Sequence, residues 1–336
     1  MKKVLVGITM MALLVGAIFA YRYYYDRKVP NFKGTVELYV YPEMDIQEVQ
    51  DSILASGTVL KPKSLGRALG SVDGFMPGHY VIDSTCTSMY AARMLHKGWQ
   101  TPVKMTLSGT IRSYRALARK IGAQMLVDSA AVASFAACAD SLAPYGVDTT
   151  LLFTRIIPDT YEFLWTTPVR GIFDRLVAES DAWWTPERLA AARKQGLTKN
   201  EAVTLASIVN GETRYVPEMP TIAGVYLNRL RSGMKLQADP TVAYCFNYSL
   251  NRILKTHLAV DSPYNTYKYF GLPPGPISCP PKACLEAAIH PASHNYIFFC
   301  ADPSFNGSHR FAATYAEHLK NARAFQRALT ERQRGK

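Results

Sequence analysis

The sequence has little of what marks nucleic-acid-binding or metal-binding proteins. It contains no C-x-x-C motif and no Cys or His spacing that is typical of zinc ligands. It has no Lys/Arg-rich run and no nucleic-acid-binding motif, although Lys and Arg number 38 and Asp and Glu only 26. The net charge of +12 therefore favours another anionic partner, such as lipid headgroups or an acidic polymer. No internal repeat is apparent, and neither a metal nor an organic cofactor is predicted.

The six cysteines lie mostly in apolar surroundings, which favours buried free thiols. They are Cys86, Cys138, Cys245, Cys279, Cys284 and Cys300. A local disulfide between Cys279 and Cys284 stays open as an alternative in an oxidising compartment.

The N-terminal segment carries an apolar run of roughly 17 residues from Val4 to Ala20, preceded by lysines and followed by four tyrosines. This length and the aromatic residues at its end predict a single membrane-spanning helix over residues 1–21. A cleaved signal peptide ending at Ala20 is the alternative. Ile18 is bulky for the small residue that such a cleavage site requires, so we favour the anchor.

Two α+β regions follow the anchor. Residues 34–100 predict a small module with the order strand, helix, helix, strand, helix, in which Asp45 caps the first helix and Gly57 ends it. Residues 101–330 predict a larger mixed α+β domain. Its expected elements are a strand at 103–107, helices at 113–121, 205–212, 220–231, 282–289 and 314–327, and a buried strand at 295–301. The basic residues of the first of these helices are expected to form a solvated face. They are Arg112, Arg115, Arg119 and Lys120.

Glu212 stands out because it ends an apolar helical stripe. Leu205, Ile208, Val209 and Glu212 are offset by 0, 3, 4 and 7 positions, which places them on one helix face. A carboxylate buried there needs a cation, or it keeps its proton near neutral pH as a general acid must. The alternative is a helix end that leaves Glu212 in water.

Polar residues follow Glu212 in a pattern that suits sugar binding. In the helix 220–231, Arg229 shares a stripe with apolar residues, and Asn228 lies beside it. Gln237 and Asp239 follow in an expected loop. Planar donors and acceptors with interleaved tyrosines can hydrogen-bond a sugar at its rim and stack against its apolar face.

The segment 262–281 contains six prolines, which fix the backbone and remove donors, so we expect a stiff loop. Such a loop would hold Tyr264, Asn265, Thr266 and Tyr267 at fixed positions, as the wall of a cleft requires.

Three motifs, in order and spacing, resemble the signature of the endolytic murein transglycosylases of the YceG-like family. They are ASIVNGET, YLNRLRSGMKLQADPTVAY and SPYNTYKYFGLPPGPIS. The resemblance is dense from Ile157 to His318 and thinner before that. It places the catalytic acid at Glu212, and it implies that the 34–100 module is LysM-like. Many members carry a second Glu where this chain has Asn210, which supports Glu212 as the essential acid.

The resemblance implies a lytic transglycosylase that cuts the MurNAc–GlcNAc bond of nascent peptidoglycan and leaves 1,6-anhydro-MurNAc ends. Such an enzyme would be a glycan-strand terminase without a cofactor. It would be anchored by one helix in the bacterial inner membrane, with the catalytic domain on the extracytoplasmic side and peptidoglycan synthases as candidate partners. Two alternatives stay open. One is a water-using muramidase with Asp239, Glu218 or Glu162 as the second carboxylate. The other is a non-catalytic glycan-binding scaffold.

Overall fold

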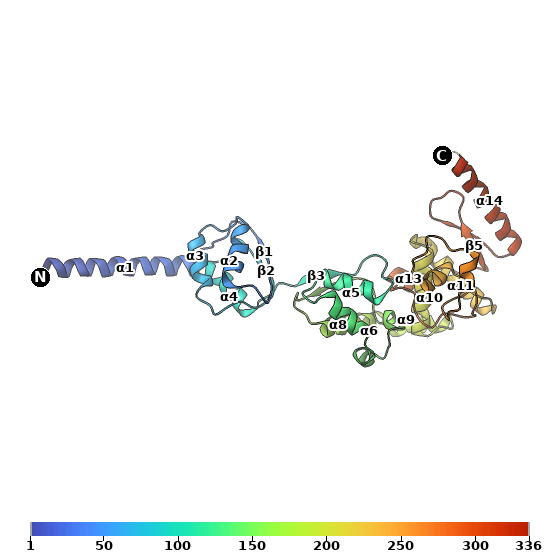
Figure 1. Ribbon diagram of the computed structural model, residues 1–336, viewed down its shortest axis with the longest axis horizontal. Coiled ribbons are helices and arrows are strands. Elements are labelled where there is room, and N and C mark those ends of the chain that lie inside the picture. The colour runs from blue at the N-terminus through green and yellow to red at the C-terminus, as the bar shows by residue number, and fades with distance from the viewer. Residues whose placement is uncertain (1, 335–336) are drawn as a thin grey trace. The chain divides into compact units, whose positions relative to one another are not determined.

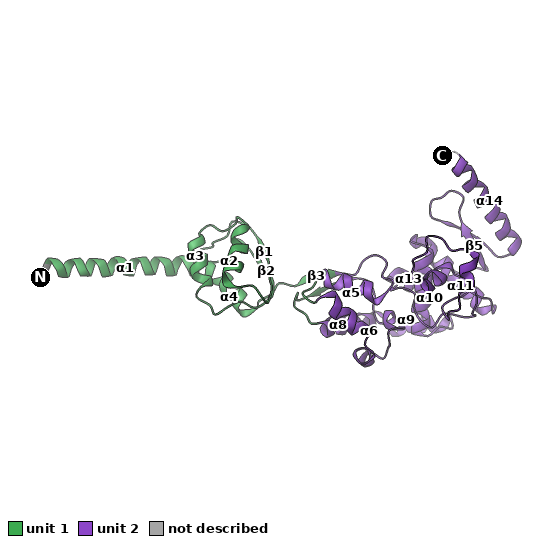
Figure 2. Ribbon diagram, viewed as in Figure 1, with its two compact units in different colours: residues 1–105, 124–127, 161–168 green, residues 106–123, 128–160, 169–336 purple. Residues whose placement is uncertain are grey.

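The computed structural model describes residues 2–334, which form two compact units. Unit 1 consists of Met1–Met105, Gln124–Val127 and Tyr161–Pro168, and unit 2 contains the rest of the chain (Figure 2). Both units mix helices with short strands, so the predicted α+β class is confirmed.

Unit 1 contains the N-terminal helix and the small module that follows it. Its elements are α1 (Lys2–Lys28), β1 (Val36–Val40), α2 (Ile46–Ala55), α3 (Pro62–Leu69), β2 (Gly78–Ile82) and α4 (Ser88–Lys97). This order is the predicted one. Strands β1 and β2 pair in antiparallel fashion, with Val36 opposite Ile82 and Val40 opposite Gly78. Helix α2 packs on β1 and α3, and α4 packs on α3 and β2 (Figure 1).

Local sequence explains the module. Asp45 accepts a hydrogen bond from the Glu48 backbone, and the Glu48 side chain accepts one from Asp45, which forms a capping box at the start of α2. The alternating side chains of β1 are buried and exposed in turn, and the buried ones join Val49 and Ile53 of α2 in one core.

Helix α1 is long and apolar enough to cross a membrane, and its apolar side chains are exposed. A membrane anchor and a signal sequence share this length and composition. Its last turn is fixed to the module. Arg67 of α3 donates to both carboxylate oxygens of Asp26 at 2.6 and 3.0 Å, and Ser64 donates to the same carboxylate at 2.5 Å.

Two further strands, β3 (Val103–Thr106) and β4 (Thr160–Phe163), pair with each other. The helices that follow β3 along the chain are α5 (Tyr114–Gly122), α6 (Ser129–Ala137), α7 (Ala139–Leu142), α8 (Val169–Trp183), α9 (Pro186–Lys194), α10 (Lys199–Glu212), α11 (Met219–Arg231), α12 (Asp239–Cys245) and α13 (Lys282–Ile289). The chain ends with β5 (Phe298–Ala301), its antiparallel partner β6 (His309–Ala312), and α14 (Tyr315–Arg334). Single 3-10 turns occur at Ala143–Tyr145, Leu152–Thr154, Val216–Glu218 and Lys255–Ala259.

Helix α10 lies in the core of unit 2, where it packs against α11 and α13 (Figure 1) and also against α12. Thr198 and Glu201 form a capping box at its start. The sequence predicted that one face of this helix, with Leu205, Ile208 and Val209, is buried. The buried surface is wider than that face, because every residue from Ala202 to Val209 is buried. From Ala202 to Val209 the helix is therefore enclosed on all sides, and Glu212 lies beyond this stretch in the last turn.

Three sequence expectations change in the structure, and two are confirmed. Asp239 begins α12 and does not lie in a loop, because the following Pro240 suits the first turn of a helix. All four residues of β5 are half-buried, so the expected buried strand is wrong in that respect. Cys138 is exposed, whereas Cys279 and Cys284 are buried and free. The segment 262–281 forms no helix or strand, as expected.

Candidate active site

A pocket of about 230 Å³ opens at the end of α10 in unit 2. Its lining comes from four parts of the unit: the segment before α5, the last turn of α10, the segment from α12 to residue 253, and the end of the Pro-rich loop. The lining residues are Thr110, Arg112, Asn210, Gly211, Glu212, Asp239, Pro240, Ala243, Tyr248, Ile253 and Ser278. The two carboxylates among them, Glu212 and Asp239, belong to different helices.

A close contact between α10 and α12 sets the floor of this pocket. A Cβ atom added to Gly211 would lie 2.5 Å from Cβ and 2.8 Å from Cγ of Pro240. Only glycine therefore lets the two helices approach this closely, and Glu212 follows it directly in sequence.

Glu212 has a hydrogen-bond donor but no paired cation. The Tyr226 hydroxyl donates to Oε1 of Glu212 at 2.5 Å. Burial raises the pKa of Glu212 to about 7; the Tyr226 hydrogen bond and the charge of Arg229 oppose this shift, and the charge of Asp239 adds to it. Among residues 2–334, Glu212 forms no ion pair. The group is therefore close to half-protonated at neutral pH.

Tyr226 is a stable donor to this carboxylate. Its side chain is almost fully buried, and burial together with the neighbouring Glu212 raises the pKa of Tyr226 well above the ordinary tyrosine value. The phenol keeps its proton throughout the physiological range. Sequence analysis placed Tyr226 on the stripe of its helix but did not assign it to the site, although its stripe position was the available signal.

Arg229 and Asn228 use their donors on backbone carbonyls. Arg229 is 8% exposed and donates to the carbonyls of Ile297 at 2.6 Å and Leu236 at 2.7 Å. The Asn228 amide donates to two carbonyls in the segment before β5. Arg229 therefore acts on Glu212 through its charge and not through a contact.

Asp239 lines the pocket, and the Tyr267 hydroxyl donates to its Oδ1 at 2.5 Å. Burial, followed by the bond to Asp239, raises the pKa of Tyr267, so this phenol also keeps its proton. Gln237 is exposed beside the pocket with a φ of 50°, a left-handed conformation that non-glycine residues seldom adopt. Its backbone N–H donates to the Thr266 carbonyl.

Of the remaining residues of the predicted cleft wall, Asn265 and Thr266 are buried and Tyr264 is half-buried. Asn265 is fully buried and donates to the carbonyls of Leu258 and Val260, which closes the turn before it. The Thr266 hydroxyl accepts from the Ala238 backbone at 2.9 Å. Tyr264 packs on Tyr244 with ring centroids 4.4 Å apart. These three side chains support the loop that presents Tyr267, and none of them lines the pocket.

Arg112 is a pocket residue that sequence analysis did not identify. It was expected on a solvated face, and it is exposed, but its guanidinium also lies 4.3 Å from the centroid of the Tyr248 ring. The antiparallel bridge between Ile111 and Cys279 brings this segment to the pocket. Nothing in the local sequence signals a contact between positions so far apart.

The other acids considered from the sequence lie elsewhere. Glu162 is exposed on β4 and does not line the pocket. Glu218 accepts hydrogen bonds from the backbone and the ring of His309, at 2.9 and 3.0 Å. Within the described part of the chain, no cluster of His, Cys, Asp and Glu is suited to a metal ion.

Comparison with known proteins identifies the family of this chain. The model of the YceG-like family matches residues 38–324, so this chain belongs to the YceG-like family. That match reaches further toward the N-terminus than the sequence motifs indicated. A crystal structure of a yceG-like protein from Listeria monocytogenes shares the fold, with a TM-score of 0.55 at 24% identity over 85% of this chain and 98% of that chain.

Two relatives carry the name endolytic murein transglycosylase. The one from Bacillus subtilis (strain 168) is 34% identical over 166 residues, which is 49% of this chain and 45% of the relative. The one from Streptococcus pneumoniae serotype 2 (strain D39) is 31% identical over 171 residues, 49% of this chain and 31% of the relative. The matched region thus spans less than half the length of either relative.

Proposed function

We propose that this protein is an endolytic lytic transglycosylase that cleaves the MurNAc–GlcNAc bond of peptidoglycan strands, with Glu212 as its acid and base. One observation carries the proposal: a carboxyl group with a pKa of about 7 lies on the floor of an open pocket without a paired cation. Such a group can both give and take a proton near neutral pH. The names of the two relatives support the choice of substrate.

In the first step the protonated Glu212 gives its proton to the glycosidic oxygen. The bond between this oxygen and C1 of the muramic residue breaks, and an oxocarbenium-like centre develops on that ring. The leaving sugar departs with its hydroxyl formed. The Tyr226 hydroxyl stabilises the carboxylate that Glu212 becomes.

In the second step the Glu212 carboxylate takes the proton from the C6 hydroxyl of the same muramic residue. The C6 oxygen attacks C1, and the 1,6-anhydro ring closes. Glu212 is protonated again, and no water is consumed. One carboxyl group therefore serves both steps, and the neighbouring Asp239 adds negative charge that keeps the pKa of Glu212 high.

The exposed guanidinium of Arg112 at the pocket suits a polymer whose stem peptides carry carboxylates. We further propose that α1 anchors the chain in the bacterial inner membrane, with residues 101–330 as the catalytic domain on the extracytoplasmic side. In this arrangement the enzyme releases strands as they are made, and synthases that extend them are its natural partners. The 34–100 module is proposed to be LysM-like and to contact glycan.

A water-using muramidase is the second candidate, because Asp239 lines the same pocket as Glu212. Glycoside hydrolases use two carboxylates, one as the acid and one as the base or nucleophile. In this alternative Asp239 would activate water or attack C1 directly.

Product analysis separates the candidates. Purified full-length protein is incubated with peptidoglycan, and the soluble products are analysed by mass spectrometry before and after borohydride treatment. A lytic transglycosylase gives ends lighter by one water that borohydride leaves unchanged. Reducing ends that borohydride converts would establish the hydrolase, and binding without any new ends would establish the scaffold.

A further inference from the structure

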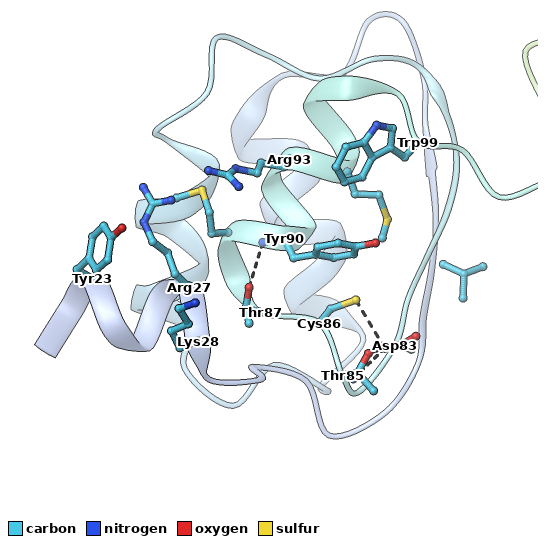
Figure 3. Close-up of a pocket in the computed structure, with 13 residues that line it drawn as sticks. Tyr23, Arg27, Lys28, Asp83, Thr85, Cys86, Thr87, Tyr90, Arg93 and Trp99 are labelled. Atoms are coloured by element: carbon cyan, nitrogen blue, oxygen red, sulfur yellow. Dashed lines mark hydrogen bonds between the residues drawn. The ribbon is translucent and has the colours of Figure 1, made fainter.

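A second and larger hollow lies in unit 1, where the end of α1 meets α4. Its volume is about 850 Å³. Its walls come from the last two turns of α1, the segment after β2, and α4 with the residues that follow it. Figure 3 shows Arg27 of α1 and Arg93 of α4 extending into the same open space, with Lys28 beside Arg27.

The charge of this hollow is mainly positive. Three cations, Arg27, Lys28 and Arg93, line it together with one acid, Asp83. The Thr85 backbone and hydroxyl donate to Asp83 at 2.8 and 2.6 Å, so this carboxylate is already occupied. None of the three cations forms an ion pair with another residue between 2 and 334. The Arg27 guanidinium lies over the Tyr23 ring, 4.7 Å from its centroid. Three cations on two different helices, without a carboxylate partner among the described residues, favour an anion between them.

A smaller hollow on α1 has the same character and adds an apolar part. It measures about 510 Å³ and is lined by four cations, two tyrosines, Ser64 and two apolar residues of α1. The cations are Arg22, Lys61, Lys63 and Arg67. The apolar residues, Ala17 and Ile18, belong to the part of α1 that is long and apolar enough to span a bilayer. A ligand in this hollow would contact apolar side chains with one part and cationic side chains with another, which suits the acyl chains and the headgroup of a lipid.

The end of α1 is held in one position on the module. Asp26 is 9% exposed and accepts two hydrogen bonds from Arg67 and one from Ser64. The Ser64 hydroxyl in turn contacts that of Ser88 on α4 at 2.9 Å. This network joins α1, α3 and α4, so the cations on α1 and α4 face each other in a fixed arrangement.

We propose that Arg27, Lys28 and Arg93, here called the headgroup site, bind the phosphate of an anionic membrane phospholipid. The tyrosines near the end of α1 suit this level, because aromatic residues gather where headgroups meet hydrocarbon. The site adds a function to the chain that is separate from glycan cleavage. It would hold the module against the membrane surface.

The test measures lipid binding to the purified full-length chain in detergent by native mass spectrometry. Phosphatidylglycerol and phosphatidylcholine, which differ in headgroup charge, are titrated separately. Each cation near an anionic lipid surface contributes enough for several-fold tighter binding, so we expect a preference for phosphatidylglycerol of about 10- to 100-fold. The triple variant Arg27→Gln, Lys28→Gln, Arg93→Gln should lower this preference by about 10-fold or more, and the cations of the smaller hollow account for any preference that remains.

A matched control removes the same net charge from exposed lysines outside both hollows. It combines Lys33→Gln, Lys97→Gln and Lys104→Gln. This control should keep the full preference. Arg93→Gln alone changes one exposed side chain on α4, so it tests the site even if the triple variant folds poorly. It should lower the preference by several-fold.

Three results would overturn the proposal. One is equal binding of the two lipids by the unchanged protein, and another is an equal loss of preference in the triple variant and the control. The third is displacement of phosphatidylglycerol by inorganic phosphate at the same concentration, which would indicate a site for free phosphate. Glycan cleavage of soluble substrate should be the same in all these variants, so lipid binding and the proposed function fail independently.

Discussion

Asp26, which is buried, and Glu212, which is half-buried at its pocket, show how differently this chain treats the same chemical group. Asp26 of unit 1 is held by Arg67 through two hydrogen bonds and by a serine hydroxyl. Glu212 of unit 2 accepts its hydrogen bond from the Tyr226 phenol and has no paired cation among the described residues. Arg229 is near enough to act on Glu212 through its charge, but its donors serve backbone carbonyls.

This comparison shows that the hydrogen-bond partner of a carboxylate decides whether it is structural or can exchange a proton. A guanidinium keeps a carboxylate charged and turns it into a structural clamp. A phenol gives one hydrogen bond without a full charge, so burial can still hold the proton on the carboxyl group. The ability of Glu212 to exchange a proton near neutral pH depends on the absence of a paired cation.

The largest expected effect comes from replacing Glu212 by Gln, because the amide has no proton that it can exchange near neutral pH. Gln can accept the Tyr226 hydrogen bond, but it cannot deliver a proton. General acid–base catalysis is typically worth ~10²–10⁴-fold, and one group serves both steps here, so cleavage should fall by at least ~10⁴-fold. Release of soluble glycan from peptidoglycan measures this loss.

Glu162→Gln is the control for that experiment, because Glu162 is exposed and does not line the pocket. It should keep nearly full activity. Retained cleavage in Glu212→Gln together with loss in Glu162→Gln would move the active site away from the pocket.

The same Glu212→Gln change should also alter how stability depends on pH. The pKa of Glu212 rises from 4.5 to about 7 on folding, so between these values the folded state binds more protons than the unfolded state. Stability from this group is full below pH 4.5 and is lost as the pH rises through 7. The variant should therefore match the wild type near pH 4 and exceed it by up to ~3 kcal/mol at pH 8. Thermal midpoints at the two pH values measure this, and equal midpoints at pH 8 would contradict it.

Removing the Asp26–Arg67 ion pair in unit 1 tests whether Asp26 has a structural role. Asp26→Asn leaves Arg67 without its carboxylate, and because Arg67 is partly exposed we expect a loss of ~2 kcal/mol. Cleavage of soluble glycan should not change. The double variant Asp26→Asn, Arg67→Gln should lose less than the two single variants added together. Strict additivity in calorimetry would show that the pair is not coupled.

The smallest effect is a shift of the pH profile in Tyr226→Phe. The hydrogen bond from this tyrosine stabilises the charged form of Glu212, so its removal should raise the pKa of Glu212 further. Cleavage requires the protonated acid and should decline above about pH 7 in the wild type. In the variant this decline should move upward by ~1 pH unit. A downward shift would mean that Tyr226 does not act through Glu212.

The sequence predicted α11 and the end of α10 well, because caps and apolar spacing are local signals, but it assigned the start of α12 to a loop. It singled out Glu212 through its neighbours at helical spacing. It could not separate polar residues that bind backbone from polar residues that face a pocket, since both occur on apolar faces. Asn228 and Asn265 were read as sugar ligands, yet their amides close loops of the protein itself. Arg112 reaches the pocket through a long-range bridge that no local pattern reveals.

The contact between Gly211 and Pro240 limits how the geometry of this pocket can change in evolution. No side chain separates α10 from α12 there, so the spacing between the two acid-bearing helices is set by backbone and a proline ring. Mutation cannot adjust that spacing gradually, because even one added methyl group collides with the ring. Under the proposed function, adaptation to other glycans is therefore expected at Thr110 and Arg112, which line the pocket from an exposed segment before α5. The spacing of Glu212 and Asp239 is therefore constrained by the backbone, whereas the side chains at the edge of the pocket can change.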